Sequence, residues 1–184
     1  MDNERGRSIA ATVGLVGVWV VVLASLTSIF RMGMWWIFAV VMIAVVLLLA
    51  MARGRWRGLR LCAGAGTGAL LVITWSAMSG NLPMWTISFS DTVLIVRDVV
   101  VRGYPPLELT GPVSDLVLLA ILLGVTGTAA VYTFARAPLA AGALGALVAL
   151  VPPAILTGRL SAWTLVGIGV SLAILVWSNA PRFS

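Results

Sequence analysis

Residues 35–60 have the sequence WWIFAVVMIAVVLLLAMARGRWRGLR, an uninterrupted apolar run followed by the densest cluster of charges in the chain. A hydrocarbon layer about 30 Å thick needs roughly 20 helical residues, because each residue adds about 1.5 Å of helix. The run 35–52 is close to that length, and the arginines after it belong in water or among lipid headgroups. This stretch therefore predicts a membrane-spanning helix that ends at an arginine-rich turn.

The same pattern recurs along the whole chain, in which 61% of the residues are hydrophobic and 10% are charged. Soluble domains carry about 25% charged residues. The longest connection, 80–115, is the one substantial polar or mixed segment between apolar stretches. We expect an all-α polytopic transmembrane helical bundle, built as a single domain over 1–184. Its six predicted spans are about 8–30, 35–52, 61–79, 116–134, 138–156 and 161–177.

Charge and residue usage exclude several classes of function. The net charge of +6 comes from twelve arginines against six acidic residues, and the chain has no lysine. The arginines lie at the ends of apolar runs rather than on one water-facing patch, which argues against nucleic-acid binding. The chain has no histidine, and Cys62 is its one cysteine, which excludes a Cys/His or Ser/His nucleophile pair and an internal disulfide. We expect no catalysis by these residues, no metal site and no cofactor.

The distribution of arginine also predicts the orientation of the chain, since short loops rich in Arg stay in the cytoplasm. A cytoplasmic N-terminus places twice as many arginines inside as outside. The outer set is Arg31, Arg97, Arg102 and Arg159, and the inner set is Arg5, Arg7, Arg53, Arg55, Arg57, Arg60, Arg136 and Arg182. We expect a bacterial plasma membrane protein with both termini in the cytoplasm. Its topology anchor is Arg53, Arg55, Arg57 and Arg60.

Tryptophans are expected near the two membrane interfaces, where an indole keeps its ring in the apolar zone and its N–H near water. Trp35, Trp36 and Trp163 fall at predicted outer ends, and Trp56 and Trp177 fall at predicted inner ends. This distribution over both interfaces favours a structural belt over a ligand cage.

Hydroxyl side chains are the main polar groups inside the predicted spans. We expect them to donate hydrogen bonds backward to helix carbonyls. A weakly polar seam along a substrate route is the alternative. The residues concerned are Thr67, Thr74, Ser76, Thr126 and Thr128.

Small residues and prolines mark places where the helices pack closely or bend. Gly64 and Gly68 form a G-x-x-x-G step that lets a second helix approach, and Gly142 and Gly145 are further packing positions. These packing positions lie within the bundle or between subunits, so the sequence allows a homo-oligomer as well as a monomer. Pro152-Pro153 predicts a bend or break in the fifth span. A static kink is expected there, and a hinge or small polar cavity is the alternative.

The outer connection contains the most distinctive polar pattern. The pattern predicts a helix cap at Ser90-Asp91 and a helix over 92–102, which would place Asp91, Asp98 and Arg102 on one helical face. This predicts a short amphipathic helix on the outer membrane surface. The β-branched content leaves a hairpin as the alternative for 91–102. The candidate partner contacts are Asp91, Arg97, Asp98, Arg102, Tyr104 and Glu108.

Several motifs give the chain a family resemblance. They are Val96-Arg97-Asp98, Gly103-Tyr104-Pro105-Pro106, the segment TFARAPLAA at 133–141 and LVPPA at 150–154. With the order of spans and loops, they resemble the N-terminal membrane region of the transglutaminase-like TgpA family. The resemblance implies an extracytoplasmic domain with a Cys, His and Asp triad after the membrane region. No triad residue can be assigned to a position in this sequence.

The expected function is a membrane anchor or scaffold that contacts the lipid bilayer and positions an extracytoplasmic domain or envelope protein for cell-envelope work. The membrane anchor is expected either to be part of a longer chain or to stand alone. Two alternatives remain. The first is a small transporter or permease subunit with a pathway near the Pro152-Pro153 kink. The second is an assembly subunit of an envelope complex.

Overall fold

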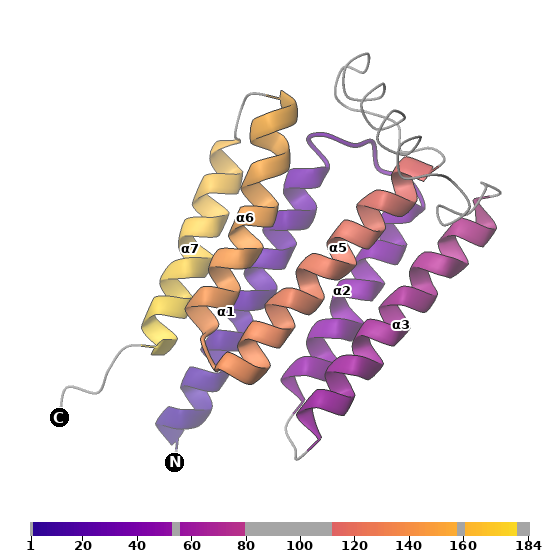
Figure 1. Ribbon diagram of the computed structural model, residues 1–184. Coiled ribbons are helices and arrows are strands. Elements are labelled where there is room, and N and C mark those ends of the chain that lie inside the picture. Colours follow the sequence, from indigo (N-terminus) through magenta and orange to yellow (C-terminus); the bar gives the residue numbers. More distant parts are fainter. Residues whose placement is uncertain (1, 53–55, 80–111, 158–160, 180–184) are drawn as a thin grey trace.

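The computed structural model describes residues 2–52, 56–79, 112–157 and 161–179. These ranges form helices throughout, joined by short turns, and no β-strand occurs within them (Figure 1). The all-α bundle predicted from the sequence is therefore confirmed. Its elements are α1 (Asp2–Leu26), α2 (Trp35–Met51), α3 (Arg57–Met78), α5 (Pro112–Ala130), the π-helical turn η2 (Val131–Ala135), α6 (Pro138–Thr157) and α7 (Ala162–Asn179).

Four segments are long and apolar enough to cross a membrane, which identifies the chain as a membrane protein. They are Ile9–Leu26, Arg57–Met78, Val113–Ala135 and Ala162–Asn179. Two further helices are apolar: α2, which is shorter and has 17 residues, and α6, which is apolar along Pro138–Pro152 and has 20 residues in all. At about 1.5 Å per residue, α2 extends over roughly 26 Å. A crossing by α2 therefore requires a slightly thinned bilayer or anchoring side chains at its ends.

The helix ends differ from the predicted spans in ways that affect polar residues. α3 begins at Arg57, so Arg57 and Arg60 belong to its first turn rather than to the preceding loop. α5 begins at Pro112, a residue suited to the first helical position, so Asp115 lies in a helix and not in the outer connection. α1 ends at Leu26, and tight turns occupy the remaining residues up to Phe30.

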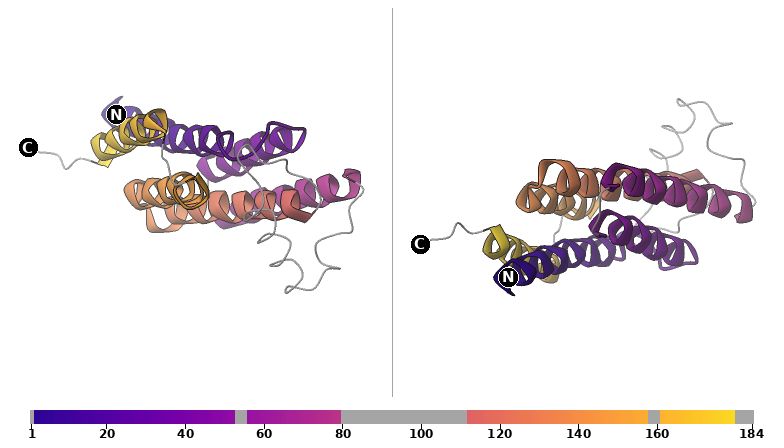
Figure 2. Two further views of the ribbon diagram at one scale, coloured as in Figure 1. Left: turned by 90° about the horizontal axis from the view of Figure 1, so that it is seen from above. Right: turned by 90° about the horizontal axis from the view of Figure 1, so that it is seen from below.

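The six α-helices of the described residues lie in two layers of three (Figure 2). α7, α1 and α2 form one layer, and α6, α5 and α3 form the other. α1 packs chiefly against α7 and α6, whereas α2 packs chiefly against α3 and α5. Contacts between α5 and α6 join these two groups. By its contacts, the bundle therefore consists of two groups of three helices, each drawn from both layers. One group is α1, α6 and α7, and the other is α2, α3 and α5.

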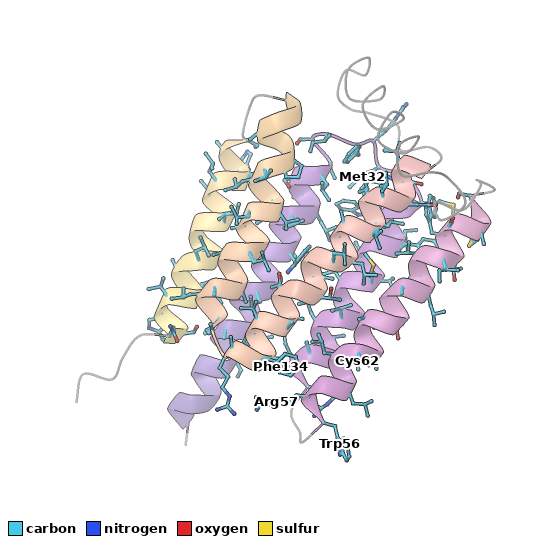
Figure 3. All side chains as sticks on the ribbon, in the orientation of Figure 1. Met32, Trp56, Arg57, Cys62 and Phe134 are labelled. Carbon is cyan, nitrogen blue, oxygen red and sulfur yellow. The ribbon has the colours of Figure 1, made fainter. Side chains whose placement is uncertain are left out.

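Successive helices run in opposite directions, so α1 begins and α7 ends at the same end of the bundle (Figure 1). Arg57 and Arg60 start α3 at this end, and Arg136 lies there between η2 and α6. We call it the arginine end. Figure 3 places Trp56, Arg57 and Phe134 at this end and Met32 at the opposite end.

The bundle is apolar on its outside as well as in its core. On α1, Leu15, Val18, Trp19 and Val22 are buried. The same helix exposes a stripe of residues at steps of four, three and four, namely Ile9, Val13, Val16 and Val20. A water-soluble helix would place polar residues on that stripe. The exposed face therefore suits contact with lipid.

Gly64 and Gly68 lie where α3 approaches its neighbours most closely. A methyl group added at Gly64 would lie 3.3 Å from Cα of Val46 in α2. One added at Gly68 would meet the side chain of Leu122 in α5. Both glycines therefore contact other helices of the same chain.

Gly142 and Gly145 occupy the corresponding positions on α6. A methyl group at Gly142 would meet the side chain of Leu175 in α7, and one at Gly145 would lie 2.6 Å from Cγ1 of Val18 in α1. These close approaches let α6 pack against both other helices of its group.

α6 continues through Pro152 and Pro153 to Thr157 as one helix. The predicted break is therefore wrong, while the predicted bend stays a prediction. In membrane bundles, neighbouring helices and local adjustments satisfy the backbone groups that proline frees, so a helix can continue through it. α6 has such neighbours in α1 and α7, on which it packs.

The hydroxyl side chains follow the expected pattern with one exception. The expectation is confirmed where the hydroxyl donates to the carbonyl four residues earlier, at 2.7–2.9 Å, as it does in Thr67, Thr74, Thr126 and Thr128. It is wrong for Ser76, whose hydroxyl contacts α5 instead.

The tryptophan belt is also only partly correct. Trp35 is buried in the core, where its indole N–H donates to the carbonyl of Arg31 at 3.1 Å. Its ring packs edge-on against Phe30 and Trp36. Trp56 and Trp177 are exposed at the arginine end, as an interfacial belt requires.

Candidate functional site

Most of the predicted contact residues lie outside the described residues. This applies to Arg53 and Arg55 of the topology anchor and to the whole predicted surface helix or hairpin at 91–102. It also applies to the partner contacts Asp91, Arg97, Asp98, Arg102, Tyr104 and Glu108. The candidate sites in the described part of the chain are a buried polar cluster at one end and a pocket at the other.

The polar cluster joins α3 to α5 at the end opposite the arginines. Ser76 donates through Oγ to Oδ2 of Asp115 at 2.7 Å, and Trp75 donates through Nε1 to Oγ of Ser114 at 2.9 Å. Ser76, Ser114 and Asp115 are all buried. Oδ1 of Asp115 has no hydrogen-bond partner among the described residues. Two adjacent residues of each helix thus form a paired contact that fixes the register of α3 against α5.

Sequence reasoning missed this cluster because it placed Asp115 at the end of a loop. Pro112 followed by Ser114 and Asp115 is a typical helix start, and that signal moves the helix boundary to the position seen in the structure. The partners lie 39 residues earlier in the chain, and no local pattern identifies them.

The pocket opens at the arginine end, where the two layers meet, and has a volume of 460 Å³. Ligand pockets typically measure about 300–1,000 Å³. Each described α-helix except α5 contributes to its walls, and η2, which follows α5, contributes as well. The lining residues are Ala11, Ala50, Met51, Ala52, Arg57, Tyr132, Thr133, Arg136, Pro138, Ser178 and Asn179. The wall therefore combines small apolar side chains with two guanidinium groups and several neutral polar groups.

The backbone is irregular where it forms one wall of this pocket. α5 ends in the π-helical turn η2, and Arg136 follows with φ 51° and ψ 33°, a left-handed conformation. Non-glycine residues adopt this conformation at a cost, and such sites cluster where function constrains the backbone. π-helical turns are likewise frequent at functional sites. The left-handed residue ends η2 and lets α6 begin at Pro138 in a new direction.

The anchor residues that the structure describes occupy different places around the pocket. Arg57 lines it, whereas the Nε of Arg60 donates to the carbonyl of Trp56 and Arg60 is not among the lining residues. Asp115 is the one carboxylate whose side chain the structure describes, and it lies at the opposite end of α5. The described residues contain no cluster of three His, Cys, Asp or Glu side chains. Cys62, on the second turn of α3, is exposed and unpaired.

Comparison of the chain with known protein families, with curated proteins and with solved structures finds no match.

Proposed function

We propose that the chain is an integral membrane anchor or scaffold that positions an extracytoplasmic domain or partner protein for work at the cell envelope. In this proposal the bundle lies in a bacterial plasma membrane, its arginine end and both termini face the cytoplasm, and its own residues perform no catalysis. The proposed partner contact is the outer connection, where the sequence predicts Asp91, Asp98 and Arg102 on one helical face.

The filled interior is the observation that most favours an anchor over a transport pathway. Leu15 of α1 and Val46 of α2 lie one turn inward from the pocket residues Ala11 and Ala50, and both are fully buried. Farther into the bundle, the buried side chain of Trp19 in α1 packs against α5 at Gly124. A close-packed bundle resists deformation, which suits a domain that holds another domain in place.

The sequence motifs support the same proposal. Residues 90–177 resemble the membrane region of transglutaminase-like TgpA proteins, in which an extracytoplasmic domain follows the spans. The resemblance implies a surface enzyme beside this bundle, with its Cys, His and Asp triad in that other domain.

The transport alternative receives less support from the described residues. The predicted pathway lies near Pro152 and Pro153, toward the end of α6 that is far from the pocket. The pocket therefore does not extend that pathway. We expect liposomes that contain this chain alone to show no substrate-dependent uptake.

Photo-crosslinking in native membranes tests the anchor. A photoreactive amino acid at position 104 of the full chain should give one discrete adduct with an envelope protein or domain. The substitution D98A/R102A should reduce that adduct several-fold. The matched control D2A/R5A also removes one acid and one arginine, but at the other end of the bundle, and should leave the adduct unchanged. Equal loss in both variants, or uptake by the liposomes, would contradict the proposal.

A further inference from the structure

Thr133 is the buried polar residue of the arginine-end pocket. Its side chain is 6% exposed and lines the pocket, yet Oγ1 has no hydrogen-bond partner in the described part of the chain. Thr126 and Thr128, seven and five residues earlier, donate their hydroxyls to the carbonyl four residues back. Thr133 lies in the π-helical turn, where that regular geometry is interrupted. A buried hydroxyl without a partner is unfavourable, and rotation of the Thr133 side chain toward the pocket would let a ligand oxygen supply the missing bond.

Two arginines line the same pocket from different elements. Arg57 comes from the first turn of α3, and Arg136 comes from the left-handed residue after η2. Arginine presents its N–H groups as a planar fork that matches a phosphate bidentately. Neutral donors are available from Tyr132 and Asn179, which also line the pocket. The polar part of the wall is therefore rich in donors and positively charged.

Helix ends add to the positive character of the site. α3 begins beside the pocket, and its N-cap residue Trp56 makes no side-chain capping bond. α6 begins at Pro138, which lines the pocket. The first turn of each helix has amide groups without intrahelical acceptors, and the helix dipole favours an anion there. The two helix starts support a site that already includes the unpartnered Thr133.

The level of the pocket relative to the membrane favours a phosphate over a free carboxylate as the ligand. Trp56, Phe134 and Trp177 are exposed around the same end of the bundle, and exposed aromatic rings mark the level of lipid headgroups. Phosphate is the anion present at that level. Basic pockets between membrane helices bind phosphate-bearing headgroups by the same chemistry.

We propose that the arginine-end pocket binds a phosphate-bearing anion through the guanidinium groups of Arg57 and Arg136 and the hydroxyl of Thr133. Phosphate oxygens accept from both arginines and from Thr133, and small residues such as Ala11 and Ala52 leave room for the rest of the ligand. The source is either the headgroup of an anionic lipid or a free phosphate compound. The site does not depend on whether the domain anchors a partner.

Binding measurements on the delipidated full chain in nonionic detergent test this proposal. In one arm, native mass spectrometry counts bound dioleoylphosphatidylglycerol, with dioleoylphosphatidylcholine as the zwitterionic comparison. In the other arm, equilibrium dialysis measures binding of radiolabelled inorganic phosphate. The wild-type chain should retain one phosphatidylglycerol more tightly than phosphatidylcholine if the source is a lipid. It should bind inorganic phosphate if the source is a free phosphate.

The variants separate a built site from general attraction to positive charge. R136Q and R60Q each remove one charge from the same end, but only Arg136 lines the pocket. R136Q should weaken binding about tenfold, the loss typical of one charge-assisted hydrogen bond, and R60Q less than about twofold. T133V, which keeps the side-chain shape, should weaken binding several-fold, and T133S, which keeps the hydroxyl, should bind like wild type. Equal losses in R136Q and R60Q, no effect of T133V, or no binding in either arm would overturn the proposal.

Discussion

Ser76 donates a hydrogen bond to Asp115 at 2.7 Å, although the two residues lie 39 positions apart and on opposite sides of the longest connection in the chain. Both side chains are buried where α3 meets α5. Oδ1 of Asp115 has no partner in the described residues, so the Ser76 hydroxyl is the one described donor to this carboxyl group. The bond therefore links the start of α5 to the end of α3.

Removing the serine hydroxyl should destabilise the bundle. Ser76→Ala leaves the buried carboxyl of Asp115 without its described donor, and we expect a loss of about 1–3 kcal/mol in the free energy of unfolding. Reversible unfolding in mixed micelles with increasing SDS, followed by circular dichroism, measures the change. Thr74→Val is the matched control, because that hydroxyl is exposed and bonds only to its own helix. A double variant S76A/D115A should cost less than the sum of the two single losses. Strict additivity would show that the bond contributes nothing.

Close packing of α3 on α2 should depend on Gly64 and not on Gly66. A side chain at Gly64 points at the backbone of Val46, whereas nothing lies within 4 Å of a methyl group at Gly66. Gly64→Leu should therefore destabilise the bundle by about 1–3 kcal/mol through overpacking. Gly66→Leu, the control on the same helix, should change stability by less than about 0.5 kcal/mol. The same SDS titration measures both variants, and equal effects would argue against the α2–α3 contact.

The left-handed backbone at Arg136 makes a further prediction about stability. Glycine adopts this conformation without the steric cost that a β-carbon adds, so Arg136→Gly should be more stable than Arg136→Ala by about 1 kcal/mol. At Arg60, inside α3, the order should reverse, because glycine is a poor helix former. Both variants of a pair lose the same arginine, so the difference between glycine and alanine at one position contains no effect of lost charge. An alanine variant at position 136 as stable as the glycine variant would contradict the positive φ.

The sequence predicted the features that local rules determine. Helix type and number follow from apolar length and from arginines such as Arg57 at the ends of runs. Backward hydrogen bonds at Thr67 and Thr128 follow from the geometry of a single helix. These interactions lie within one turn of the residue that makes them, so a pattern in the sequence is enough to find them.

The features that were missed depend on how the helices meet. Trp35 has the position of an interfacial residue, but its contacts with Phe30 and Trp36 bury it. Ser76 looks like the other hydroxyls, and only α5 provides its acceptor. The pocket at Thr133 needs the π-helical turn and helix ends from both layers. Tertiary packing determines all three, and no local spacing encodes it.

The measurement that most directly tests the account is the sidedness of positions 32 and 56, which flank the short helix α2. Both side chains are exposed, and they lie at opposite ends of the bundle (Figure 3). In a Cys62→Ala background, Met32→Cys and Trp56→Cys are treated with a membrane-impermeant maleimide in intact and in permeabilised cells. The account predicts that intact cells label position 32 alone and that permeabilised cells label both positions. Labelling of both positions from outside would show that α2 does not cross the membrane and would contradict the account.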